Sequence, residues 1–135
     1  MTRIVIFLLI LSCVLQVNAE TDRQHLGSWS APMPDGETIR WVFGETQLVQ
    51  HTYGEVITNS YTIDYLHDPI LLDITVEYKI PTNSTIATSL GPMKCIMQFL
   101  DISRFRVVGE YMKSKPRPIT FEGIENILIF TKEEE

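Results

Sequence analysis

Apolar and polar residues alternate with a period of two along most of the chain after residue 26. The clearest example is Ile70–Lys79, where every second residue from Leu72 onward is apolar and the residues between are Asp, Thr, Glu and Lys. Such alternation is typical of β-strands with one buried face. It predicts eight strands: Gly27–Ser30, Thr38–Phe43, Thr46–Thr52, Glu55–Tyr65, Ile70–Lys79, Lys94–Leu100, Arg104–Tyr111 and Asn126–Thr131.

Residues typical of turns separate these segments, and helical periodicity is almost absent. A short helical turn is expected at Asp22–Leu26, a polar loop at Pro81–Pro92 and a basic, proline-bearing loop at Met112–Pro118. Antiparallel strands with short connections either pack as two sheets or close into a barrel. We expect an all-β fold, a small antiparallel up-and-down barrel of about eight strands, because closure removes exposed edges. The alternative is a β-sandwich.

The first nineteen residues differ from the rest. Arg3 is followed by the apolar run Ile4–Leu11, and a short polar stretch ends at Ala19, the order of a cleaved secretory signal. The apolar run is too short to span a bilayer. We therefore expect removal of residues 1–19, one domain over residues 20–135, and a secreted or periplasmic location. As an alternative, Ile10-Leu11-Ser12-Cys13 loosely resembles a bacterial lipobox, which would anchor the protein to lipid through Cys13.

The composition of the chain limits the classes of partner that are expected. The chain has 11 Lys and Arg against 17 Asp and Glu, a formal net charge of −6. Such an acidic chain is a poor partner for nucleic acid or an anionic membrane, both of which attract clustered Lys and Arg. Beyond the predicted signal only Cys95 remains, so no internal disulfide is expected, and Cys95 is interpreted as a small buried hydrophobe. Asn83-Ser84-Thr85 is a sequon for N-glycosylation in the predicted loop.

Several short motifs fall in one order along the chain: Gly27-Ser28-Trp29, Tyr61-Thr62-Ile63-Asp64, Asp68-Pro69, Leu72-Asp73-Ile74 and Arg117-Pro118-x-x-Phe121. The first resembles the Gly-x-Trp signature of lipocalins. The whole series is similar to a bacterial lipocalin-like family best known from planctomycetes, over roughly Leu26–Phe121. The family's Gly-Ile-Tyr is replaced here by Cys95-Ile96-Met97.

This resemblance implies a lipocalin-like barrel with Gly27 and Trp29 at its floor. It marks Asp64, Asp73, Arg117, Pro118 and Phe121 as family-motif residues, and it implies no particular ligand.

No catalytic constellation is recognised, and no metal or cofactor is expected. His25, His51 and His67 have no metal-like spacing with one another or with a cysteine. Asp64 is interpreted as a turn residue whose carboxylate accepts from nearby backbone N–H groups. Arg117 is expected to cap backbone carbonyls or to pair with a carboxylate. A hydrolase-type enzyme using Asp64, Asp73 or His67 is retained as the weakest alternative.

Aromatic residues are abundant, and some of them fall on predicted inward faces. In a barrel they would line an apolar cavity, with tyrosine hydroxyls as polar anchors. The candidate ligand-binding residues are Trp41, Tyr61, Met97, Phe105 and Tyr111. The leading hypothesis is an exported lipocalin-like protein that binds a small apolar molecule. The alternative is a filled barrel that acts as a non-catalytic interaction or envelope-associated module.

Overall fold

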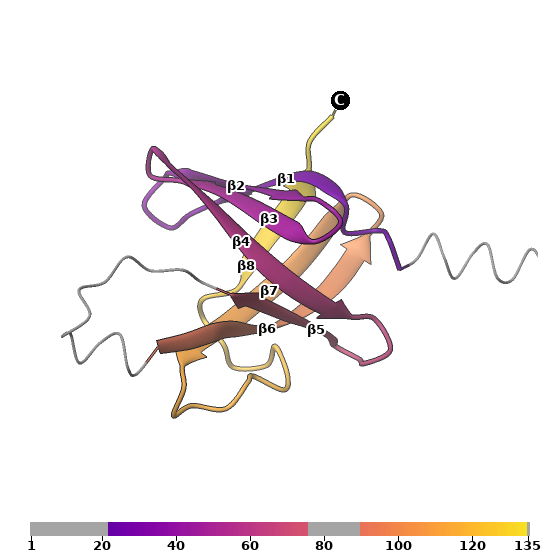
Figure 1. Cartoon of the computed structure of the whole chain (residues 1–135), viewed down its shortest axis with the longest axis vertical. Helices are drawn as coiled ribbons and strands as arrows, with labels where there is room; N and C mark the ends of the chain where they lie inside the picture. Colours follow the sequence, from indigo (N-terminus) through magenta and orange to yellow (C-terminus); the bar gives the residue numbers. More distant parts are fainter. Residues whose placement is uncertain (1–21, 76–89, 135) are drawn as a thin grey trace, which may run out of the picture.

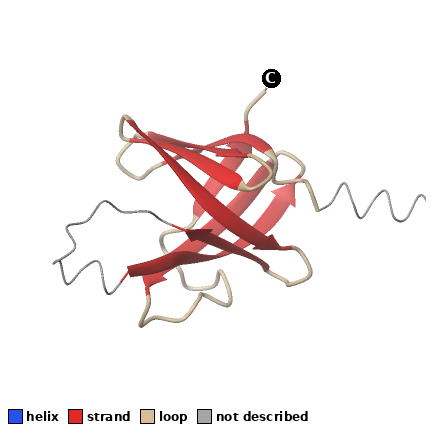
Figure 2. Cartoon of the chain, in the orientation of Figure 1, coloured by secondary structure: helices blue, strands red, loops and turns tan. Residues whose placement is uncertain are grey.

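The computed structural model describes residues 22–75 and 90–134, and these residues form an eight-stranded antiparallel β-barrel (Figure 1). Each strand pairs with the next along the chain, and β8 pairs with β1 to close the sheet. The strands are β1 (Gly27–Pro32), β2 (Thr38–Phe43), β3 (Gln47–Thr52), β4 (Glu55–Asp64), β5 (Ile70–Thr75), β6 (Leu90–Asp101), β7 (Arg104–Met112) and β8 (Leu128–Lys132). The part of the chain that is described contains strands and loops without a helix (Figure 2).

The predicted up-and-down barrel is confirmed, and the β-sandwich alternative is wrong because the sheet closes on itself. Strand boundaries needed one clear correction. β6 begins at Leu90, so Leu90–Pro92 belongs to a strand and not to the predicted loop. Pro92 is accommodated because the β6–β7 register is irregular between Leu90 and Lys94, and an irregular position does not require the missing N–H.

Smaller differences lie at the ends of elements. Residues 22–25 form a turn, in which the Leu26 N–H donates to the Arg23 carbonyl at 3.1 Å, and no helix follows. β8 begins at Leu128, two residues after the predicted start. The predicted signal, Cys13, Asn83 and the end of the predicted strand Ile70–Lys79 lie outside the described residues.

Large aromatic side chains fill the barrel interior. The rings of Phe105 and Phe130 stack with centroids 5.0 Å apart, and Trp29 meets Phe105 edge-on at 4.8 Å. Trp41 extends this cluster, with its ring centroid 4.5 Å from that of Phe130. Cys95 is also buried, as predicted, and burial raises the pKa of its thiol to about 12. A buried thiol with a raised pKa stays protonated and unreactive, so Cys95 acts as a core residue.

The two ends of the barrel carry different loops, because successive hairpins of an up-and-down barrel alternate between ends. The β2–β3, β4–β5 and β6–β7 turns share one end with the segment that precedes β1 (Figure 1). We call this the closed end. The β1–β2 and β3–β4 turns lie at the opposite end, which we call the open end.

The long connection between β7 and β8 packs against the outside of the barrel. Phe121 from this connection is buried against Ile96 of β6 and Val108 of β7, and the Arg106 guanidinium lies 4.0 Å from the centre of its ring. Arg117 pairs with Asp73 of β5 and donates to the Cys95 carbonyl at 2.7 Å. Both expected roles of Arg117 are therefore confirmed: it pairs with a carboxylate and it caps a carbonyl.

Candidate functional site

A pocket of about 600 Å³ lies at the open end of the barrel. Its walls come from β2, β3, β4, β6 and β7, together with Met33 of the β1–β2 turn and residues at the start of β8. The lining residues are Met33, Ile39, Trp41, Gln50, Thr52, Tyr53, Ile57, Asn59, Met93, Cys95, Val107, Val108, Gly109, Glu110, Tyr111, Asn126 and Leu128. Its volume falls within the roughly 300–1,000 Å³ that ligand pockets usually have.

The pocket forms because the interior side chains become smaller toward the open end. On β7 the inward positions run from Phe105 through Val107 to Gly109, and the last has no side chain. On β6 the corresponding inward residues are the flexible Met93 and the small Cys95. At the rim, the Tyr53 hydroxyl donates to Asp35 at 2.7 Å and so links the β3–β4 turn to the β1–β2 turn.

Two kinds of polar group interrupt the apolar wall. Asn59, which is 2% exposed, donates to the Gln50 side chain at 2.7 Å. The indole nitrogen of Trp41 is also buried, and it has no hydrogen-bond partner among the residues that the structure describes. A buried donor without an acceptor is rare in folded proteins and destabilises the free protein.

The lining carries little charge. Glu110 is the one carboxylate among the described lining residues, and none of these residues is Lys, Arg or His. The Glu110 side chain accepts from the Met112 N–H at 3.0 Å. The pocket therefore offers an anionic ligand no counter-ion within the described part of its wall.

The closed end is filled instead of hollow. His25 from the segment before β1 is 5% exposed, and its ring contacts Phe43 of β2 and Tyr61 of β4 edge-on. The Trp29 indole N–H donates to the His25 carbonyl at 2.8 Å. The segment before β1 thus crosses this end of the barrel and is held there by ring contacts and hydrogen bonds.

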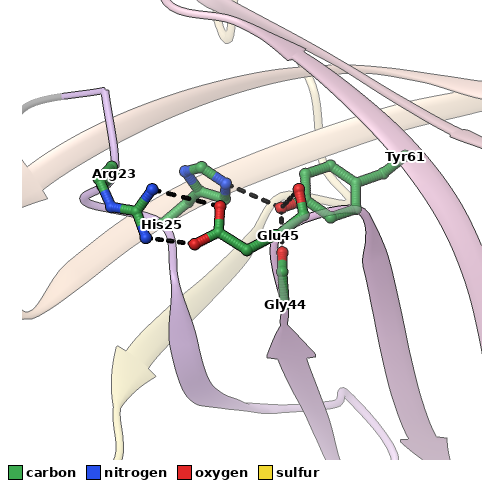
Figure 3. A network of polar contacts seen from close by, with 5 residues as sticks. All are labelled: Arg23, His25, Gly44, Glu45 and Tyr61. Carbon is green, nitrogen blue, oxygen red and sulfur yellow. Dashed lines mark hydrogen bonds and ion pairs between the residues drawn. The ribbon is translucent and has the colours of Figure 1, made fainter. Parts of the chain in front are cut away.

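The hydrogen bonds of His25 define its protonation, and Figure 3 shows those that run through Tyr61 to Gly44. The Tyr61 hydroxyl donates to the Gly44 carbonyl, which has no proton to give, so His25 Nε2, 2.9 Å away, donates to Tyr61. In a neutral ring Nδ1 then accepts, and the Tyr65 hydroxyl at 2.7 Å is its donor. Every proton in this chain of bonds has an acceptor.

Burial sets the titration of this cluster. It lowers the pKa of His25 to about 4, with a smaller contribution from the Arg23 guanidinium. It also raises the pKa of Tyr65 to about 12. Arg23 forms an ion pair with Glu45 beside the ring, and this hydrogen-bonded pairing lowers the pKa of the Glu45 carboxyl. The histidine is therefore neutral at pH 7 and serves as a structural plug.

The structure brings two of the five candidate ligand-binding residues to the pocket. Trp41 and Tyr111 line it. Tyr61, Met97 and Phe105 do not: Tyr61 belongs to the His25 cluster, and the other two are fully buried in the core. Their expected place in a pocket is corrected, because alternation predicts which side chains face inward and not how far along the axis the interior is filled.

The remaining motif residues have structural partners. Trp29 is fully buried at the closed end, and the Gly27 backbone has a φ of 111°, which favours glycine. Asp64 accepts from the Leu66 N–H at 2.9 Å within the β4–β5 turn, as predicted. Asp73 faces outward and pairs with Arg117, next to which Pro118 leads toward Phe121.

His67 Nδ1 lies 3.1 Å from the Pro69 carbonyl in the exposed β4–β5 turn. Asp73 is on the outer wall, so the residues named for the hydrolase alternative do not converge on the pocket. Among the described residues, no three His, Cys, Asp or Glu side chains gather in a group that could hold a metal ion. Nor does any described helix have the length and apolar character needed to cross a membrane.

Sequence reasoning missed Asn59, Gln50 and Met33 as pocket residues. A signal existed for Asn59, which has the same parity on β4 as Ile57 and Tyr61 and is therefore an inward polar residue. Gln50 shares the inward parity of Leu48 on β3. A polar residue at an inward position points to either a satisfied pair or a ligand, and here it forms the pair described above.

Comparisons of the chain with protein-family models, with curated proteins and with solved structures found no significant match. Functional inference therefore depends on the geometry of the barrel and its pocket.

Proposed function

We propose that this protein is a non-catalytic, lipocalin-like binding protein that holds a small, mostly apolar molecule in the pocket at the open end. The observation that carries the proposal is the pocket itself, which is lined mainly by apolar and aromatic side chains and closed at one end of the barrel by the His25 cluster. Burial of apolar ligand surface would supply about 25 cal/mol per Å². The filled-barrel alternative predicts no such volume.

Export of the protein is part of the proposal and rests on the signal pattern of residues 1–19. The mass of the protein recovered outside the cytoplasm of its host tests it. A mature chain that begins at Glu20 would support cleavage of the signal. A lipid-modified chain that begins at Cys13 would support the anchored alternative, and an intact Met1 would contradict both.

The pocket is tested by filling it. Ile57 lines the pocket from β4, while its neighbour Thr58 is exposed on the outer face of the same strand. Ile57→Trp should weaken binding of the neutral fluorescent probe N-phenyl-1-naphthylamine by about tenfold or more, because the indole occupies the volume that the probe needs. Thr58→Trp is the matched control and should leave the affinity unchanged.

Probe fluorescence, excited directly to avoid the added tryptophan, gives the affinity of each variant. Circular dichroism and urea unfolding of both variants establish that the barrel is intact. Binding that is equally strong in both variants would place the probe elsewhere. Absence of probe binding in the unsubstituted protein would favour the filled-barrel alternative.

A further inference from the structure

The pocket contains one donor for which the described protein supplies no acceptor. Trp41 is 3% exposed and lines the pocket from β2, and its Nε1 atom is buried without a hydrogen-bond partner. Every other buried side-chain nitrogen or oxygen in the described residues has a partner. The exception therefore coincides with the pocket.

The packing of Trp41 against other aromatic rings explains why its indole N–H is buried from solvent. One part of the indole packs on Phe130, with ring centroids 4.5 Å apart, and on Phe43, edge-on at 5.8 Å. Trp41 thus stands between the filled half of the barrel and the pocket. A donor buried in this way gains from an added acceptor, because no bond to water has to be given up first.

The neighbouring lining residues can yield to a ligand. Met33 and Met93 both line the pocket, and methionine side chains are unbranched and adapt to irregular shapes. Gly109 allows Met93 to pack closely against β7, since a Cβ atom there would lie 2.8 Å from the Met93 Cγ. We expect a ligand to displace the flexible methionine side chains as it approaches the indole.

The charges on the pocket wall indicate which class of hydrogen-bond acceptor the pocket favours. A carboxylate is the strongest acceptor, but the described lining provides no basic side chain to pair with it. Burying a carboxylate without a cationic partner is strongly unfavourable. A neutral carbonyl, ester or ether oxygen accepts from the indole without this cost.

We propose that the ligand is a neutral, mainly apolar molecule with one hydrogen-bond acceptor, which accepts from the Trp41 Nε1–H. This inference rests on the proposed binding function and narrows it to a chemical class. It assigns Trp41 the role of selecting a neutral acceptor over a plain hydrocarbon, while the lack of basic side chains in the described wall disfavours a carboxylate of the same size.

Three probes with one ring system test the assignment: naphthalene, 2-acetylnaphthalene and 2-naphthoate. Trp41→Phe retains an aromatic ring and removes the donor. We expect the variant to bind 2-acetylnaphthalene about fivefold to tenfold more weakly, the value of one hydrogen bond, and naphthalene within about twofold of the unsubstituted protein. In both proteins 2-naphthoate should bind about tenfold or more weakly than the ketone.

Naphthalene is the internal control, because loss of packing in Trp41→Phe affects all three probes alike. Ile39→Leu is a second control, since it reshapes the pocket wall without removing a donor. A uniform loss of affinity for all probes, or the tightest binding for 2-naphthoate, would overturn the inference while leaving the pocket intact. If none of the three probes binds the unsubstituted protein by calorimetry, the proposed function fails as well.

A direct readout avoids dependence on the variant. The chain has two tryptophans, so ¹⁵N-labelled protein gives two indole N–H signals, and Trp41→Phe assigns them. We expect 2-acetylnaphthalene, and not naphthalene, to shift the Trp41 indole proton downfield. An equal response to both probes would show that the N–H makes no bond to the ligand.

Discussion

At the scale of single residues, the close packing of β6 against β7 beside the pocket depends on one missing side chain. Gly109 faces inward on β7, where a Cβ atom would lie 2.7 Å from the Cys95 Sγ and 2.8 Å from the Met93 Cγ. Its backbone is not in the left-handed region, so the requirement for glycine is one of space. The sequence shows a glycine within a predicted strand, and the structure shows which side chains pack against it.

Gly109→Ala should lower the free energy of unfolding by about 1–2 kcal/mol, because a methyl group overfills the contact with β6. Adding Cys95→Ala removes the sulfur that the methyl group meets. The double variant should therefore be less destabilised than the sum of the two single variants, by about 0.5 kcal/mol or more. Urea unfolding of the four proteins measures this coupling.

Gly44→Ala is the control, since a Cβ there has only the Gln47 carbonyl within reach, at 3.4 Å. It should cost less than about 0.5 kcal/mol. Strict additivity of Gly109→Ala and Cys95→Ala would mean that the barrel adapts at this point and that the contact does not limit the pocket.

At the scale of elements, the sequence predicted the strands well because one face of each is buried. Ile39, Trp41 and Phe43 of β2 face inward as the alternation required. The alternation failed where both faces of a strand are covered. Ile96 and Val108 lie on the outer wall of the barrel and are buried there by Phe121. No local period reveals this layer, since it depends on a connection that returns from residues 113–127.

The same limit applies to the site. Alternation correctly placed Trp41 and Tyr111 on inward faces, and both line the pocket. It placed Phe105 and Met97 inward too, but these lie where aromatic rings fill the barrel. How far along the barrel axis side chains fill the interior depends on contacts between residues of six different strands. The alternation within a single strand does not predict these contacts.

The outer layer provides a prediction at this scale. Arg117→Ala should destabilise the barrel by about 1–2 kcal/mol, because it removes the ion pair with Asp73 and the hydrogen bond to the Cys95 carbonyl. It should also speed cleavage after Glu122 by a glutamate-specific protease, since the connection is released from the wall. Arg117→Lys should rescue little, because one ammonium does not reproduce the two-pronged contact.

Arg104→Ala is the matched control. Arg104 pairs with Asp101 at 2.9 Å in the β6–β7 turn, where both side chains are largely exposed, and exposed pairs contribute about 0–1 kcal/mol. We expect unchanged cleavage after Glu122 in this variant. An Arg117→Ala protein with the stability and cleavage rate of the control would show that Phe121 alone anchors the connection.

At the scale of the whole molecule, the two ends of the barrel differ, because the closed end is filled and the open end holds the pocket. The closed end concentrates paired polar groups around His25, while the indole donor of Trp41 beside the pocket has no partner among residues 22–75 and 90–134. A polar network in which every member is satisfied favours one arrangement of its side chains, while an unsatisfied buried group calls for an explanation such as a missing partner.

The buried, neutral His25 at the closed end makes the stability of the molecule sensitive to acid. The folded-state pKa of about 4 lies below the ordinary 6.5, so between these values the unfolded chain binds more protons than the folded one. Stability is therefore complete above pH 6.5 and falls as the pH decreases toward 4. From about pH 7.5 to pH 5 the loss should be about 2 kcal/mol, measured by urea unfolding at each pH.

His25→Gln removes the titrating ring, so it should be less stable at neutral pH but nearly flat between pH 6.5 and pH 5. His67→Gln is the control, because His67 lies in an exposed turn with its Nδ1 against the Pro69 carbonyl, and it should retain the full decline. The carboxylates that Arg23 and Tyr53 hold below their usual pKa add their own losses in more acidic solution. If His25→Gln kept the decline, the acid sensitivity would come from another group, and the neutral, fully bonded plug would not be what closes this end of the barrel.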